Sequence, residues 1–255
     1  MAGYFDIDVN DVVEYIARKR AEGVRLTITH FTAAAVSRAL YEDIPDINCY
    51  VKRGKIVYRE DANVCVSISV EGGKGMSAYV IPKTQELSAT QISKLIREKA
   101  AEKRAGKESG GFGAKDTIGR IPWPFRRPIF RLIKWILFEL GLPIPFLKLP
   151  KDPFGSTMLT NIGVFGLEYG SVALFPIGKL PFVITMGALK QKPTVRDGEI
   201  VIRWFLPVSG TFDHRIVDGA QIGVLANGVV KHLSDPEALD RPNPPREETA
   251  DESES

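Results

Sequence analysis

The stretch SGTFDHRIVDGAQIG, residues 209–223, places His214 between two aspartates in a chain that has only three histidines. A free imidazole has a pKa of roughly 6.5, so it can accept a proton and return it near neutral pH. Asp218 can orient or electrostatically support the local structure, and Gly219 permits close packing beside it. The group offers a general base, a carboxylate and a small residue. By themselves, these residues leave two interpretations open: a catalytic base or a structural histidine.

The chain around His214 changes from a strand-like to a helix-like pattern. The residues before it are typical of a strand, and residues 218–232 are typical of a helix. His214 thus lies where a strand ends, a place that projects a side chain from a rigid support. Asp218 is also a candidate N-cap of the helix, and capping is compatible with support of His214. His30 and His232 are interpreted as lying at the start of a helix and at a solvated helix end.

Three blocks of the sequence follow the patterns of one known family. The first pattern, DHRxxDG, is intact at Asp213, His214, Arg215, Asp218 and Gly219. STMLTNIGVFG (156–166) is similar to TFTxSNxGxxG, with Thr160 at the serine position, then Asn161, and with Gly163 and Gly166 in the turn. The third block comprises GYFDIDVNDVVEYIARKR, LTITHFTAAAVSRAL and IPDINCYVKRGKIVYREDANVCVSISVEGG. In this order, the blocks resemble the acyltransferase core of 2-oxo-acid dehydrogenase complexes, whose catalytic domain is shared with chloramphenicol acetyltransferase.

The resemblance, over residues 3–106 and 153–235, implies transfer of an acyl group between coenzyme A and a thiol acceptor of the dihydrolipoamide type. In this family a histidine deprotonates the thiol, the thiolate attacks the thioester carbonyl, and a hydroxyl from a neighbouring subunit stabilises the oxyanion. By position, His214 is implied as the general base, Asp218 as the supporting carboxylate and Thr160 as the hydroxyl donor. Further residues implied at the substrate site are Asn161, Gly163, Asp213, Arg215 and Gly219.

The same resemblance implies a homotrimer with its active sites between subunits. Coenzyme A is expected as a substrate, and no metal is expected because no CxxC or HExxH spacing occurs. We expect no lipoyl attachment on this chain, so a lipoyl group would come from a partner protein. Cage-forming cores of the family end in an apolar tail, whereas residues 241–255 are polar, which predicts a trimer without further assembly.

Several alternatives remain open at this point. Thr160 is either the oxyanion donor, with a methyl group that narrows the pocket, or simply a β-branched strand residue. The domain is either an active acyltransferase, a catalytically lapsed trimeric scaffold, or a core protein associated peripherally with a membrane. An antibiotic acetyltransferase is a further alternative, although the DHR wording favours the dehydrogenase-complex branch. The sequence does not name the acyl group or the acceptor.

The composition is that of an ordinary globular protein, with 44% hydrophobic and 25% charged residues among 255. A net charge of +3 is too small to indicate nucleic-acid binding. Cys49 and Cys65 are interpreted as free, buried thiols in a reducing compartment, and the N-terminus lacks the pattern of a signal peptide. We therefore expect a cytoplasmic protein, with a peripheral position at the membrane as the alternative.

The hydrophobic periodicity predicts an α/β fold in which helices pack on a mixed sheet, and the resemblance implies the chloramphenicol acetyltransferase type. Strands are predicted at 5–9, 47–51, 56–58, 64–70, 76–81, 156–161, 182–189, 194–195 and 200–209. Helices are predicted at 11–22, 31–41, 88–104, 125–140 and 218–232. Asn10, Thr29 and Ser88 are predicted to cap helices, and Asp197-Gly198 is predicted to form a hairpin turn.

Residues 107–152 are predicted to form an apolar, amphipathic insertion in a catalytic core that comprises residues 1–106 and 153–235. Arg127, Arg131 and Lys134 share one helical face, and the rest of that helix is covered by Ile129, Phe130, Leu132, Ile133, Trp135, Ile136 and Leu137. The segment is too short and too charged to span a bilayer comfortably. It would either pack against a neighbouring subunit, cover the active-site mouth, or lie on a membrane surface through residues 121–150. Residues 241–255 are predicted to be a disordered, acidic tail.

Overall fold

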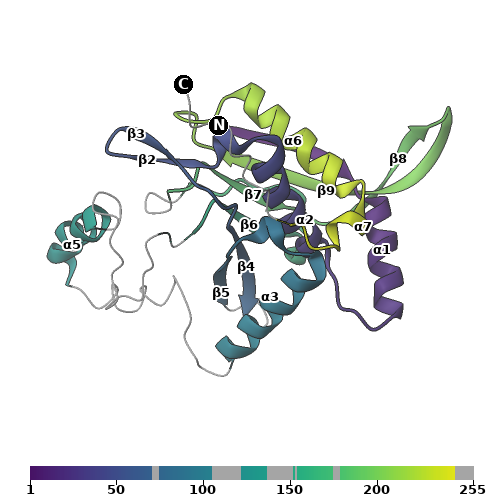
Figure 1. Cartoon of the computed structure of the whole chain (residues 1–255), viewed down its shortest axis with the longest axis horizontal. Helices are drawn as coiled ribbons and strands as arrows, with labels where there is room; N and C mark the ends of the chain where they lie inside the picture. Colours follow the sequence, from purple (N-terminus) through teal and green to yellow (C-terminus); the bar gives the residue numbers. More distant parts are fainter. Residues whose placement is uncertain (71–74, 105–121, 137–151, 153, 175–178, 245–255) are drawn as a thin grey trace.

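The computed structural model describes residues 1–70, 75–104, 122–136, 152, 154–174 and 179–244. Its centre is one mixed sheet in the order β1-β9-β7-β6-β4-β5, with β8 paired to β9 (Figure 1). The strands are β1 (Ala2–Asp8), β4 (Val64–Val70), β5 (Gly75–Ile81), β6 (Thr157–Asn161), β7 (Phe182–Met186), β8 (Lys190–Arg196) and β9 (Glu199–Phe212). Two pairs, β4 with β6 and β6 with β7, are parallel, and the other pairs are antiparallel. The prediction of a mixed sheet is confirmed.

Helices gather on one face of this sheet (Figure 1). They are α1 (Asn10–Ala21), α2 (Ile28–Arg38), α3 (Ala89–Arg104), α6 (Gly219–Leu233) and α7 (Pro236–Leu239), and α2 continues into a π-helical turn, η1 (Ala39–Asp43). Short 3₁₀ turns occur at Pro45–Ile47, Thr84–Glu86 and Gly163–Phe165, and β2 (Cys49–Lys52) pairs with β3 (Lys55–Tyr58) as a separate hairpin. The helix α5 (Trp123–Trp135) lies apart from the sheet. None of the described helices is both long and apolar enough to cross a bilayer.

Alternation along the strands divides the apolar side chains between the two faces of the sheet. Leu159 and Ile184 point toward the helices and join the main core, in which Phe31 of α2 is fully buried. Met158 and Val183 point to the opposite face, where they form a smaller cluster. Both faces are therefore covered at these strands, as the predominantly apolar sequence of β7 requires.

The tight turns agree with the sequence prediction. Asp197 and Gly198, which join β8 to β9, have φ values of 51° and 84°. Both angles are positive, as the type I′ hairpin turn requires, and glycine adopts such angles without steric cost. The resulting β8–β9 hairpin projects beyond the helical layer (Figure 1).

Two of the three predicted helix caps were wrong, each by a shift of one turn or less. Val9 is the N-cap of α1, and Asn10 is already helical because the Asp8 carboxylate accepts its backbone N–H at 3.1 Å. Thr27, not Thr29, caps α2, since its backbone N–H donates to His30 Nδ1 at 3.2 Å. The prediction for Ser88 is confirmed, because Ser88 Oγ accepts from the Gln91 N–H at 3.1 Å.

The reading of His232 as a solvated helix end was also wrong. Its Nε2 lies 2.9 Å from Asp43 Oδ2, and its side chain is 12% exposed. The π-helical turn η1 brings Asp43 against α6, where Lys231 also pairs with it. This contact links α2 to the last turn of α6.

The start of the predicted disordered tail is held by the core. The buried guanidinium of Arg38 donates to the carbonyl of Arg241 at 2.6 Å, and the Asn243 N–H donates to the carbonyl of Glu86 at 3.0 Å. Disorder was therefore the wrong prediction for these positions, whereas residues 245–255 lie outside the described part of the chain. So do most of the predicted insertion, apart from α5, and residues 137–140 of its predicted helix.

Candidate active site

His214 lies in a tight turn directly after β9. The backbone N–H of Asp213 donates to the carbonyl of Pro181 at 2.8 Å, and the Asp213 carbonyl accepts from the N–H groups of Ile216 and Val217, each at 3.1 Å. These bonds fix the turn to the start of β7, so the support of His214 is rigid. The imidazole itself is exposed and makes no hydrogen bond with any described residue. A proton acceptor is thus presented to solvent or to a neighbouring molecule.

Asp213 and Arg215 bind each other on either side of His214. Arg215 Nε donates to Asp213 Oδ1 at 2.9 Å, and its Nη2 donates to Oδ2 at 2.5 Å. These hydrogen bonds lower the pKa of Asp213 and raise that of Arg215, since each favours the charged form. Both groups therefore stay ionised, and in the single chain they order the turn.

Asp218 acts as the N-cap of α6. Its Oδ1 accepts from the Gln221 N–H at 2.9 Å, and Gln221 Oε1 accepts from the Asp218 N–H at 3.0 Å. This reciprocal capping box confirms the helix-start interpretation. Among the described residues, no hydrogen bond joins Asp218 to His214. The expected close packing at Gly219 does not occur within one chain, because a Cβ there would meet nothing within 4 Å.

Thr160 lies in a row of three hydroxyl residues that crosses the sheet. Thr160 of β6 is opposite Thr185 of β7, which is opposite Ser209 of β9. The row belongs to the face that points away from the helices, because Thr160 is two residues beyond Met158. Thr160 is 4% exposed, and its hydroxyl makes no hydrogen bond with a described residue. The hydroxyl therefore keeps its donor free.

The residues after Thr160 attach this end of β6 to both faces. Asn161 points to the helical side, where its Nδ2 donates to Thr29 Oγ1 at 3.2 Å and its Oδ1 is buried without a partner. Gly163 packs against backbone, since a Cβ there would lie 2.4 Å from the Gly187 carbonyl oxygen. Gly166 has a φ of 78°, which confirms its predicted place in a turn.

Within one chain, His214 and Thr160 lie at opposite ends of β7. Thr160 is level with Thr185 near the end of that strand, whereas Phe212, two residues before His214, is level with Phe182 at its start. At about 3.3 Å per residue and about 4.8 Å between strands, Thr160 and Phe212 are roughly 14 Å apart. An oxyanion donor must lie about 3 Å from the oxyanion. Within one subunit, the register therefore keeps Thr160 and the base of the His214 turn far beyond this distance.

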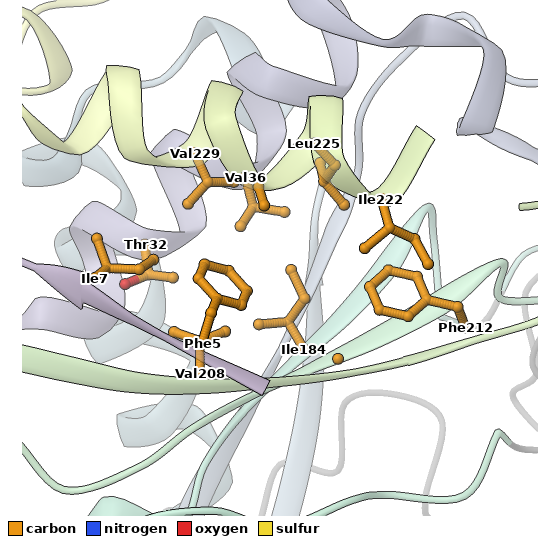
Figure 2. A pocket seen from close by; sticks show the side chains of 12 residues that line it. Phe5, Ile7, Thr32, Val36, Ile184, Val208, Phe212, Ile222, Leu225 and Val229 are labelled. Carbon is orange, nitrogen blue, oxygen red and sulfur yellow. The ribbon is translucent and has the colours of Figure 1, made fainter. Parts of the chain in front are cut away.

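An apolar cavity lies beneath the end of β9, between the sheet and α6 (Figure 2). Its volume of about 20 Å³ has room for roughly one water molecule, and no titratable side chain lines it. Phe212 borders the cavity and stacks on Phe182 with ring centroids 5.7 Å apart. A Cβ on Gly210 would lie 2.4 Å from the Phe212 ring. These residues anchor the base of the His214 turn, and the cavity is part of the core.

His30 is the most strongly shifted histidine, and its sequence context gave only the helix start. It is 7% exposed at the first turn of α2. Burial, together with the charge of Arg97, lowers the pKa of His30 from 6.5 to about 4. Its neutral Nδ1 can thus accept the Thr27 N–H at ordinary pH. The shift arises from tertiary burial, for which the sequence carried no signal.

Comparisons with known proteins identify the family of the chain. The model of the family described as 2-oxoacid dehydrogenases acyltransferase (catalytic domain) matches residues 3–110 and 150–240. The chain belongs to this family. A relative from Bacillus subtilis, the dihydrolipoyllysine-residue acetyltransferase component of an acetoin cleaving system, is 26% identical over 85% of the chain. The aligned part makes up 44% of that relative, so the chain matches less than half of its length.

Solved structures share the fold. A probable dihydrolipoamide acetyltransferase from Listeria monocytogenes superposes with a TM-score of 0.68 at 20% identity, covering 96% of this chain and 87% of that one. A chloramphenicol acetyltransferase superposes with a TM-score of 0.52 at 14% identity, covering 91% and 87% of the two chains. The predicted chloramphenicol acetyltransferase-like fold is confirmed.

Proposed function

We propose that this chain is an acyltransferase that moves an acyl group between coenzyme A and a thiol of the dihydrolipoamide type, with His214 as the general base. The observation that carries the proposal is the exposed imidazole on a rigid turn, with Asp213 engaged by Arg215 and Asp218 engaged by Gln221. His214 alone in the motif keeps its acid–base group free for a substrate. Membership of the acyltransferase family gives this histidine its chemical context.

The reaction needs only proton transfer and one exchange of bonds at carbon. His214 takes the proton of the acceptor thiol, and the thiolate attacks the thioester carbonyl of acyl-coenzyme A. When the tetrahedral species collapses, the bond from carbon to the coenzyme A sulfur breaks. The imidazolium then returns its proton to the departing thiolate. No metal takes part, and the balance requires no oxidant or reductant.

The hydroxyl of Thr160 from a neighbouring subunit would stabilise the oxyanion. This assignment is supported by its free donor and by the roughly 14 Å that separates Thr160 from the base of the His214 turn within one chain. A site that needs both groups must form between subunits, which fits a homotrimer. Asn161 and Gly163 would fix the donor, because they tie the end of β6 to Thr29 and Gly187. A partner protein would carry the lipoyl group.

Thiol release from a panel of acyl-coenzyme A donors, with dihydrolipoamide as acceptor, tests the proposal. A positioned general base contributes about 10²–10⁴ in rate, so His214→Ala should reduce turnover by about that factor. His232→Gln is the matched control, since His232 is engaged by Asp43 and should leave turnover unchanged. Equal loss in both variants would contradict the assignment. A trimeric sample with no turnover for any donor would instead favour the scaffold role.

A further inference from the structure

The helix α5 presents an apolar stripe whose side chains are exposed or half-buried, and Ile133 beside the stripe is buried. Phe125, Ile129, Leu132 and Ile136 recur at spacings of four, three and four residues, which places them on one side of the helix. Phe125 is 59% exposed and Leu132 is 54% exposed. The helix lies apart from the sheet and from the other helices (Figure 1). An exposed stripe of this kind indicates a binding surface.

The opposite side of α5 is basic. Arg127 and Arg131 are exposed and lie one turn apart. At about 100° per residue, Arg127 lies at least about 140° and Arg131 at least about 100° around the helix axis from every stripe residue. The sequence of α5, WPFRRPIFRLIKW, contains four arginines or lysines and no acidic residue. Since the whole chain carries +3, the residues outside α5 sum to −1. The excess of positive over negative charge in the chain is therefore due to this helix.

We propose that α5 is an interfacial helix that docks the protein on an anionic lipid surface. Its apolar stripe would enter the boundary between headgroups and acyl chains, while Arg127 and Arg131 bind lipid phosphates. Trp135, 51% exposed, lies between the two faces, the position at which tryptophan anchors interfacial helices. Four cations within nine residues place the helix in the plane of the interface rather than across the bilayer.

The size of the apolar surface favours lipid over a second copy of the chain. The exposed apolar side chains of α5 offer on the order of 400–500 Å², whereas each partner in a stable protein interface contributes about 800 Å². Binding to a bilayer requires no such minimum area. Each cation near an anionic surface also raises the binding constant about fivefold. The proposal is independent of the acyltransferase reaction.

Co-sedimentation of the full chain with vesicles tests the docking. The chain should bind vesicles of phosphatidylcholine with about 30% phosphatidylglycerol far better than pure phosphatidylcholine, and 1 M salt should release it, because the Debye length falls to about 3 Å. Arg127→Glu/Arg131→Glu should weaken binding by more than about thirtyfold. Leu132→Ser should weaken binding without a change in charge.

The matched control is Arg20→Glu/Arg25→Glu, which makes the same change in net charge at two exposed residues near the end of α1. It should keep the binding of the parent. Equal loss in the control, or equal binding to neutral vesicles, would overturn the proposal. A chain that does not bind vesicles would also overturn the proposal. If its particle mass then falls in Arg127→Glu/Arg131→Glu, α5 joins copies of the chain instead. Acyl transfer in solution, measured on the same variants, should be unchanged.

Discussion

Replacing His30 with glutamine should reduce the loss of folding stability that the protein shows as the pH becomes acidic. In the folded chain, burial with the charge of Arg97 holds the pKa of His30 at about 4, against 6.5 in the unfolded chain. Between these values the unfolded chain binds a proton that the folded chain does not, so stability falls as the pH decreases. This difference in pKa lowers the free energy of unfolding by about 2 kcal/mol between pH 7 and pH 5, and by about 3 kcal/mol in total once the pH is below 4.

Glutamine is the suitable replacement because it has no titrating proton and can accept the same Thr27 N–H as the third residue of a capping box. Urea unfolding of parent and His30→Gln at pH 7 and at pH 5 measures the effect. The parent should lose about 2 kcal/mol more than the variant between the two pH values. His214→Gln, at an exposed histidine, is the control and should behave as the parent does. Equal losses in parent and His30→Gln would refute the reasoning.

Three further substitutions test the site. Thr160→Val should lower kcat by about 10²–10³, whereas Thr160→Ser should preserve kcat. The unfolding midpoints of both variants should equal that of the parent. Full activity of the valine variant would show that the Thr160 hydroxyl takes no part in the reaction. Asp218→Ala should lower the free energy of unfolding in urea by about 1 kcal/mol, and Asp218→Asn should restore the parental value. An equal loss in the asparagine variant would show that Asp218 acts through its charge rather than as the N-cap of α6. Gly163→Ala places a Cβ 2.4 Å from the Gly187 carbonyl oxygen, so the loop must shift. The rate of acyl transfer should then fall by about 10², although the protein still assembles. Turnover equal to that of the parent would show that the position of this loop does not matter for the reaction.

Much of the fold was predictable because the alternation of residues along a strand indicates which of its side chains are buried. The alternation of Val64–Val70 and the Asp197-Gly198 turn depend on neighbouring residues, and both predictions are confirmed. Helix caps were harder, because several polar residues compete at one helix start and tertiary contacts choose among them. At α1, the Asp8 carboxylate satisfies the Asn10 N–H, so the asparagine enters the helix instead of capping it.

The site was predictable as a set of residues but not as an arrangement. The motif names His214 and Thr160, yet only the strand register places them at opposite ends of β7. The partner of His232 was likewise hidden, since Asp43 reaches it from a π-helical turn almost 190 residues earlier in the chain. Such contacts depend on the packing of α2 against α6, for which neither helix carries a local signal.

Mixing two defective variants tests most directly that the site forms between subunits. His214→Ala and Thr160→Val are co-expressed in equal amounts, and mass spectrometry confirms that assembled trimers contain both. In random assembly, about one quarter of the sites combine an intact His214 from one subunit with an intact Thr160 from its neighbour. Turnover should recover to about one quarter of the parent value, from variants that are each about 10² or more below it. No recovery in mixed trimers would contradict the account, because both groups would then have to come from one subunit.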